Sequence, residues 1–163
     1  MNIPVFVSSP TALSRKQESA RIMILHQLED NGLEPRTLGR SDYPTELPLR
    51  EVLIIARRCS GGVILGFEQF RALSVTKPSH KNQKPTSKVS FPTPWNQLEA
   101  GILFSLRLPL LVFREKSIEG GVFDRGVTDV FLHLMPTAQT NTDSLRQVFQ
   151  KWAGKVRDHY YSI

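Results

Sequence analysis

The stretch TPWNQLEAGILFSLRLPLLVF, residues 93–113, predicts a capped helix followed by a buried strand, and the predicted fold is built around it. Thr93 can accept hydrogen bonds from the free N–H groups of the first helical turn. Pro94 suits the first helical position, where no N–H is needed. The apolar run 109–113 then has the length and composition of a buried strand.

Glu99 is a carboxylate on a helix that is otherwise almost wholly apolar up to Arg107. Such a helix is expected to be covered by neighbours on most sides. Trp95 precedes Glu99 by four residues, so both lie on one helix face. A carboxylate in this position can stabilise the cation-like sugar that develops when a glycosidic C–N bond breaks, or attack that carbon. The alternative is a first-turn glutamate that complements the helix dipole or pairs with an arginine.

Length and composition indicate one globular domain, residues 1–163. The chain is long enough to bury a core, and 40% of its residues are hydrophobic. Cys59 is the single cysteine, which excludes an intramolecular disulfide and fits a reducing cytoplasm. No signal peptide and no membrane-spanning run is evident, and the four histidines lack metal-ligand spacing, so no metal and no membrane partner are expected. The net charge of +6 suits an anionic partner.

Strand-like and helix-like segments alternate along the chain. Buried strands are predicted at 3–8, 34–38, 63–67 and 109–113, and helices at about 15–31, 47–58, from Thr93 and from Asn141. The periodicity of 127–134 fits either a last strand or a short helix. The alternation implies an α/β fold with a mostly parallel sheet and helices on both faces.

A basic insertion at about 68–92 interrupts this pattern. It contains three prolines, and no acidic residue lies between Glu68 and Glu99. Its basic residues are Arg71, Lys77, Lys81, Lys84 and Lys88. The composition predicts a long, solvated and mobile loop, which can act as a lid over the helix start. The alternative is that the lysines at 77–88 bind nucleic acid or a pyrophosphate. Interleaved aromatic residues are lacking, so binding of nucleic acid is not favoured.

Ligands of parallel α/β sheets bind outside the carboxyl ends of the strands. There Ser8, Ser9 and Pro10 follow the first strand, and the serines with nearby N–H groups can hold a phosphate, helped by Arg15. A plain strand-to-helix turn is the alternative. Neither GxGxxG nor GxxxxGK[ST] is present, which argues against an ordinary dinucleotide fold and against a nucleoside triphosphatase.

Aromatic and loop residues complete the predicted substrate site. Phe67 and Trp95 can stack on a base or a nicotinamide ring, although such residues are more often core. Asn96 adjoins Trp95 on the same helix. Arg40, in the loop after the second strand, can meet a ribose or a phosphate, or simply be solvated.

Two short motifs resemble known families. The run 5–10, VFVSSP, resembles the first strand and loop of Toll/interleukin-1 receptor (TIR) domains, and Trp95-x-x-x-Glu99 resembles their tryptophan–glutamate helix motif. The run 96–102, NQLEAGI, with the following strand, is also similar to nucleoside 2-deoxyribosyltransferases and related N-glycosidases. Both resemblances imply a flavodoxin-like, TIR-like three-layer sandwich.

The resemblance implies a function as well as a fold. It implies that Glu99 cleaves the nicotinamide–ribose bond of NAD, by hydrolysis, cyclisation or transfer, with NAD as substrate and no cofactor. It further implies a homo-oligomer with a partner effector protein, acting in bacterial antiphage defence. The alternatives are a nucleoside or nucleotide N-glycosidase and a silent adaptor that binds nucleotides or self-associates.

Overall fold

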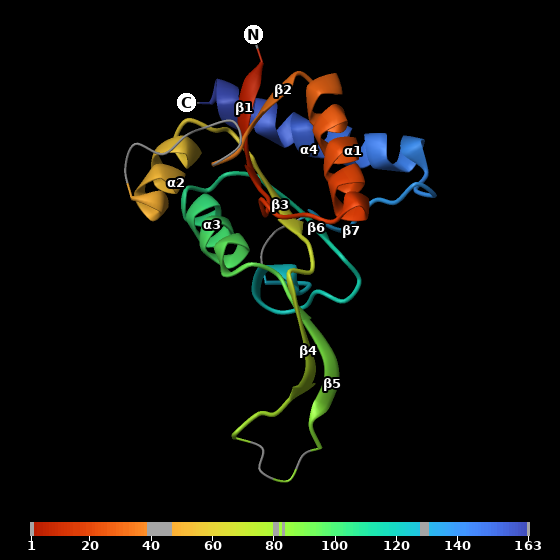
Figure 1. Cartoon of the computed structure of the whole chain (residues 1–163). Helices are drawn as coiled ribbons and strands as arrows, with labels where there is room; N and C mark the ends of the chain where they lie inside the picture. The colour runs from red at the N-terminus through yellow and green to blue at the C-terminus, as the bar shows by residue number, and fades with distance from the viewer. Residues whose placement is uncertain (1, 39–46, 80–81, 83, 128–130, 163) are drawn as a thin grey trace.

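The structure, a computed structural model, describes residues 2–38, 47–79, 82, 84–127 and 131–162. Within these ranges a parallel sheet has the strand order β2-β1-β3-β6-β7, and β4 and β5 form a separate antiparallel pair (Figure 1). The strands are β1 Ile3–Ser8, β2 Leu33–Arg36, β3 Gly62–Gly66, β4 Phe70–Val75, β5 Thr86–Phe91, β6 Leu110–Arg114 and β7 Phe131–Leu134. The helices are α1 Arg15–Asp30, α2 Pro48–Ala56, α3 Pro94–Ser105 and α4 Thr142–Tyr161, with a short 3₁₀ turn, η1, at Gly121–Phe123.

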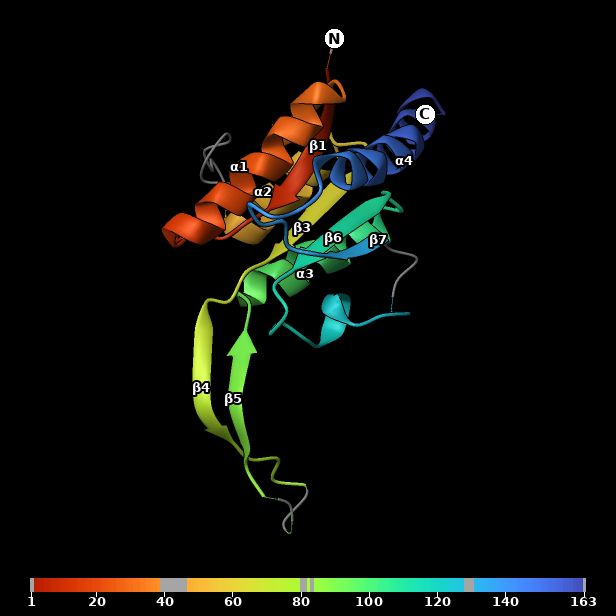
Figure 2. The ribbon, with the colours of Figure 1, turned by 90° about the vertical axis from the view of Figure 1, so that its right-hand side faces the viewer.

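Helices cover both faces of the parallel sheet. Leu28 of α1 and Trp152 of α4 lie in one buried cluster on one face. Val52 of α2 and Leu103 of α3 lie in a second cluster on the other face (Figures 1 and 2). The predicted flavodoxin-like three-layer α/β sandwich is therefore confirmed. None of the helices described is long and apolar enough to cross a membrane.

Local signals in the sequence set the helix ends. Ser14 and Gln17 form a reciprocal capping box at the start of α1, and Gly32 follows its end with φ of 70°, which favours glycine. The Thr93 side chain accepts from the N–H of Trp95 at the start of α3. The segment whose periodicity fitted strand or helix ends in strand β7, which pairs with β6.

The prediction that neighbours cover α3 on most sides is wrong. Leu98 and Phe104 are exposed, whereas Ala100 and Leu103 are buried. The reason is that α3 belongs to an outer layer, so its covered sides are those toward the sheet, α2 and η1.

The prediction of a long loop at 68–92 is also wrong. The runs that form β4 and β5 are rich in β-branched and aromatic residues, and they pair from Phe70↔Phe91 to Val75↔Thr86. The three prolines lie outside both strands, where no ladder N–H is required. The result is a hairpin that projects from the body of the molecule (Figure 2). We call it the arm.

The strand order brings the ends of β1 and β3 together. Both strands run parallel to each other, and the chain continues from β1 toward β2 on one side and from β3 toward β6 on the other. This reversal of strand order leaves a crevice at the carboxyl ends of β1 and β3, where open α/β sheets bind ligands. The loop after Ser8, the base of the arm and the start of α3 converge on that crevice.

Gly66 and Gly154 give a matched test of the packing. A Cβ atom at Gly66 would lie 2.4 Å from Cε1 of Phe123, in the core, whereas one at Gly154 of α4 meets nothing within 4 Å. We expect Gly66→Ala to lower the free energy of unfolding by about 1–3 kcal/mol through overpacking. Gly154→Ala should raise it by up to about 1 kcal/mol through helix propensity. Urea denaturation measures both, and equal stability of the two variants would contradict the described packing.

Candidate functional site

A cavity of about 470 Å³ lies where β1 ends and α3 begins. A pocket of this volume at a strand-order reversal is typical of a small-ligand site. Its walls come from the loop after β1, the approach to α2, the base of the arm and the first turns of α3. The lining residues are Ser8, Ser9, Pro10, Thr11, Ala12, Leu38, Pro48, Gln69, Phe70, Thr93, Pro94, Trp95, Asn96 and Glu99.

Glu99 is the one carboxylate among these lining residues, and it is 8% exposed. Burial raises the pKa of Glu99 from 4.5 to about 7, because the charged form loses water. A hydrogen bond from Ser8 acts in the opposite direction and lowers this pKa. The carboxyl group can therefore exchange a proton near neutral pH, as general acid–base catalysis requires, and its ionised form can act as a nucleophile.

Ser8 and Asn96 form a polar chain that ends at Glu99. The Nδ2 group of Asn96 donates to Oγ of Ser8 at 2.8 Å, and both residues are buried. The Ser8 hydroxyl has one hydrogen, which the bond to Glu99 uses. The predicted phosphate contact of Ser8 stays a prediction, and the described contacts of its side chain are with Asn96 and Glu99. Oδ1 of Asn96 is buried and has no hydrogen-bond partner among the described residues.

Two aromatic residues line the pocket and remain exposed. Trp95 is on the first turn of α3, and Phe70, which the sequence interpretation missed, begins β4 at the base of the arm. Phe70 is 62% exposed, so its ring is available to a planar ligand group. The only available signal for Phe70 was an aromatic residue just after the third strand, and the sequence interpretation assigned that role to Phe67.

The assignment of Phe67 to the substrate site is wrong. Phe67 is fully buried in the cluster between the sheet and helices α1 and α4, together with Val63 and Leu65. Side chains alternate along the strand, so these three lie on the face opposite to α3 and Glu99. Phe67 is a core residue.

Neither of the two arginines of the predicted site is found among the described residues that line the pocket. Arg15 is exposed at the start of α1 and does not line the pocket, so the predicted phosphate contact is wrong for the cavity around Glu99. Arg40 lies outside the described residues. Ser9 and Pro10 do line the pocket, but none of the described lining residues is a lysine or an arginine. A phosphate inside this cavity would therefore meet no cation from these walls.

Three other cavities lack a buried carboxylate among the described residues that line them. One of about 640 Å³ lies at the amino ends of β6 and β7, and it has no carboxylate among its lining residues. Another of about 680 Å³ contains Glu68 and Glu115. Across the described ranges, no group of three or more His, Cys, Asp or Glu residues could hold a metal ion. Glu99 therefore distinguishes the pocket at the end of β1.

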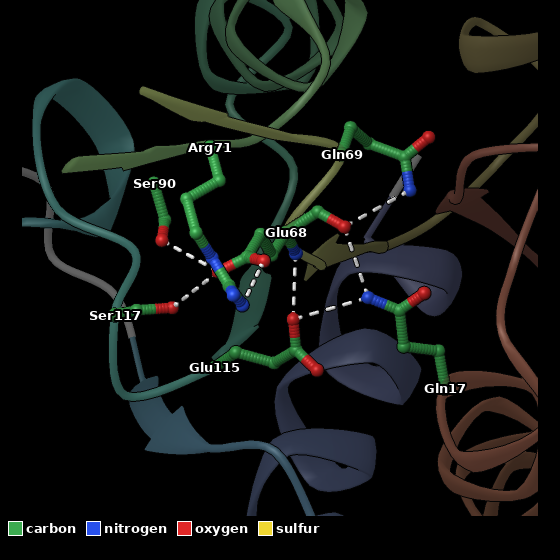
Figure 3. A network of polar contacts seen from close by, with 7 residues as sticks. All are labelled: Gln17, Glu68, Gln69, Arg71, Ser90, Glu115 and Ser117. Atoms are coloured by element: carbon green, nitrogen blue, oxygen red, sulfur yellow. Dashed lines mark hydrogen bonds and ion pairs between the residues drawn. The ribbon is translucent and has the colours of Figure 1, made fainter. Parts of the chain in front are cut away.

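Glu68 fixes the base of the arm to the body (Figure 3). Its carboxylate accepts from Oγ of Ser90 at 2.5 Å and from Arg71 at 2.5 Å, and these bonds hold the pKa of Glu68 below its ordinary value. Its backbone N–H donates to Glu115 at 2.6 Å, and its carbonyl accepts from Gln17 at 3.0 Å. The network ties both arm strands to α1 and to the segment after β6. It thereby positions the adjacent pocket residues Gln69 and Phe70.

Comparisons with known proteins identify the fold. No protein-family model matches the chain, and no curated protein matches it. The resemblance to TIR domains is therefore not supported by a family match. The structure is similar to a CMP N-glycosidase from Clostridium botulinum, with a TM-score of 0.54 and 11% identity over 91% of this chain and 98% of that chain.

Flavoproteins share the same architecture. Diflavin flavoprotein A3 from Nostoc sp. has a TM-score of 0.53 and 13% identity, over 99% of this chain and 96% of that chain. The flavodiiron core of Flv1 from Synechocystis sp. has a TM-score of 0.51 and 11% identity, over 97% of this chain and 36% of that chain. At these identities the likeness shows a flavodoxin-like fold, which N-glycosidases and flavoproteins both use.

The buried carboxyl group of Glu99 predicts a specific pH dependence of stability. Because its pKa is higher in the folded state, the folded protein binds the proton more tightly. Glu99 therefore favours folding below about pH 4.5, and this contribution is lost as the pH rises to about 7. We expect Glu99→Gln, which carries no charge, to gain stability relative to the wild type over this range, by on the order of 3 kcal/mol.

Urea denaturation at pH 5 and pH 8.5 measures this difference. The exposed residue Glu29 on α1 provides the control. Glu29→Gln removes the same charge from a solvated carboxylate, so no buried charge is relieved. A constant stability difference between Glu99→Gln and wild type at both pH values would contradict the described burial of Glu99.

Proposed function

We propose that the protein hydrolyses the N-glycosidic bond of a nucleotide, with Glu99 as the catalytic carboxylate. The observation that carries this proposal is the desolvated Glu99 inside a ligand-sized pocket at the carboxyl ends of the strands. The similarity to a CMP N-glycosidase supports it at the level of fold. The fold alone does not distinguish an N-glycosidase from a flavoprotein, so the argument rests on the residues of the site.

In the proposed reaction the C1′–N bond breaks and the base leaves with the electron pair. Positive charge develops on C1′ and the ring oxygen, and the ionised carboxylate of Glu99, which is itself largely buried, stabilises it. Water adds its oxygen to C1′, one of its protons passes to the solvent, and the base takes up a proton. The products are a free base and a ribose phosphate. A covalent bond from Glu99 to C1′, later hydrolysed, is the two-step version of the same reaction.

The other pocket residues have supporting roles in this proposal. Ser8 donates to Glu99 and fixes the orientation of its carboxylate, and Asn96 holds Ser8. Trp95 and Phe70 frame the base at the mouth of the pocket.

NAD is the second candidate substrate, from the similarity of the Trp95–Glu99 motif to that of TIR domains. A dinucleotide carries a pyrophosphate, and none of the described lining residues offers a cation for it. A mononucleotide can leave its single phosphate at the mouth of the pocket. We therefore favour a mononucleotide unit over NAD. A role in antiphage defence remains a prediction of the motif alone.

Base release tests the proposal directly. Purified protein is incubated with CMP, the other ribonucleoside monophosphates and NAD, and free base or nicotinamide is measured by chromatography. We expect release of a base from a mononucleotide and a loss of at least about 10²–10³-fold in kcat for Glu99→Gln. Glu29→Gln, the same change at an exposed site, should keep the wild-type rate. Equal rates for wild type and Glu99→Gln would remove Glu99 from the mechanism, and release from NAD alone would reverse the order of substrates.

The pH profile tests which form of Glu99 is active. If the ionised carboxylate stabilises the developing cation, kcat/KM should rise about tenfold per pH unit below pH 7 and level off above it. The half-maximal point should lie near the pKa of about 7. A profile that falls as the pH rises through 7 would instead assign Glu99 as the acid that protonates the leaving base.

A further inference from the structure

The arm is an ordered element that stands apart from the sheet. Its two strands pair with each other, and between the arm and the rest of the described chain the ladder contact is one bridge from Ser90 to Ile118 at the base (Figures 1 and 2). An isolated two-stranded hairpin has little stability of its own in water. The Glu68 network holds the base of the arm in place (Figure 3). The arm begins beside the Glu99 pocket, which Gln69 and Phe70 line.

The arm carries unpaired positive charge. Lys77, Lys84 and Lys88 are exposed, and none of them makes an ion pair within the described residues. No aspartate or glutamate occurs between Gln69 and Leu98 in the sequence, so nothing on the arm itself offsets this charge. The backbone at Lys88 has φ of 56°, a conformation that favours glycine, yet a lysine stands there. The surface is complementary to a polyanion.

The arm also exposes large apolar side chains. Leu73 is 77% exposed, and Phe70 and Phe91, which are 62% and 42% exposed, are directly opposite each other at the base. The sequence interpretation set aside nucleic-acid binding because aromatic residues seemed absent among the lysines. The hairpin pairing brings Phe70 and Phe91 together at the base of the arm, beside the pocket. Lysines followed by exposed aromatic rings are the features that bind single strands through phosphates and base stacking.

We propose that the arm binds single-stranded nucleic acid and presents one nucleotide of the strand to the Glu99 pocket. Lys77, Lys84 and Lys88 contact the phosphates, and Phe91 stacks on a base at the point where the arm meets the body. Strand binding stands on the arm alone, whereas presentation to the pocket rests on the proposed function.

The pocket and the arm complement each other in this arrangement. The described walls of the pocket offer a carboxylate and aromatic rings but no cation, while the lysines lie on the arm that begins at its rim. A base and sugar therefore fit the pocket, and the phosphates of the same strand fit the arm. A single strand is favoured over a duplex, because an unpaired base can enter a pocket without the energy of unpairing.

Salt-dependent binding of a labelled single-stranded oligonucleotide of about 20 nucleotides tests the proposal. The protein is Glu99→Gln, so that turnover does not alter the probe. Its affinity should fall as salt rises from about 50 to 200 mM. Replacing Lys77, Lys84 and Lys88 together by Gln should weaken binding and reduce the slope of log K against log salt by about 2, since each phosphate contact on a single strand contributes about 0.7.

A matched triple variant controls for net charge. Replacing Arg57, Arg58 and Lys151 by Gln removes the same charge from exposed positions away from the arm. This variant should keep the slope. Circular dichroism verifies that both triple variants fold. Equal slopes for the two variants, or no binding by the parent protein, would overturn the proposal.

Phe91→Ala tests stacking separately from charge. Phe91 does not line the Glu99 pocket. Its loss should weaken strand binding by between about fivefold and a hundredfold and leave the salt slope unchanged. Phe104→Ala, which removes an exposed ring from α3 away from the arm, should have no effect. Equal affinity of both variants would remove stacking from the proposal.

Two further results separate the arm from the catalytic proposal. Strand binding that depends on the arm lysines, without base release from any nucleotide, would support the arm and refute the proposed reaction. Base release from CMP without strand binding would do the reverse. Binding of a duplex as tightly as a single strand would overturn the assignment of a single strand to the arm. So would a triple lysine variant whose self-association changes while its strand binding does not.

Discussion

The burial of one carboxylate, Glu99, is the constraint on which this account depends. A charged carboxylate is stable in a largely dry site only if it is neutralised, paired or hydrogen-bonded. In this site its described hydrogen-bond partner is Ser8, whose hydroxyl lowers a pKa that burial raises. The arrangement requires β1 to end at Ser8 and α3 to begin within one turn of Asn96, which the Thr93 cap ensures. The sheet and its caps therefore hold a proton-exchanging group at the edge where α/β folds bind ligands.

The arm extends this site beyond the body of the fold. It begins immediately after β3, so its position follows from the same strand-order reversal that creates the pocket. Glu68 is central to this connection, because its side chain holds both arm strands while its backbone is held by Glu115 and Gln17. The carboxylate of Glu68, which follows the third strand, therefore has a structural role that is separate from the site of Glu99. The apolar and aromatic wall of the pocket and the basic arm provide different chemistry at one edge of the molecule.

Much of the fold could be predicted from local signals, and parts of the site could not. The capping residues Ser14, Thr93 and Asn141 and the turn at Gly32 act within a few residues, so helix ends were predictable. Glu99 was found because its charge contrasts with an apolar helix. Phe67 was misassigned because the face of a buried strand residue depends on strand phase, which a continuous apolar run does not reveal. The arm was missed because its stability depends on pairing between strands separated by prolines, and on Glu68 contacts with residues distant in sequence. The contacts of Ser8 with Asn96 and Glu99 could not be predicted, because they join residues distant in sequence.

A direct titration of Glu99 tests the central claim. The carboxyl carbon of Glu99, labelled with ¹³C and assigned by comparison with Glu99→Gln, is followed by NMR as the pH changes. The account predicts a midpoint near pH 7, reflecting a desolvated carboxyl group that exchanges its proton near neutrality. A midpoint near 4.5, the value of an exposed glutamate, would show that the group is solvated and would contradict the account.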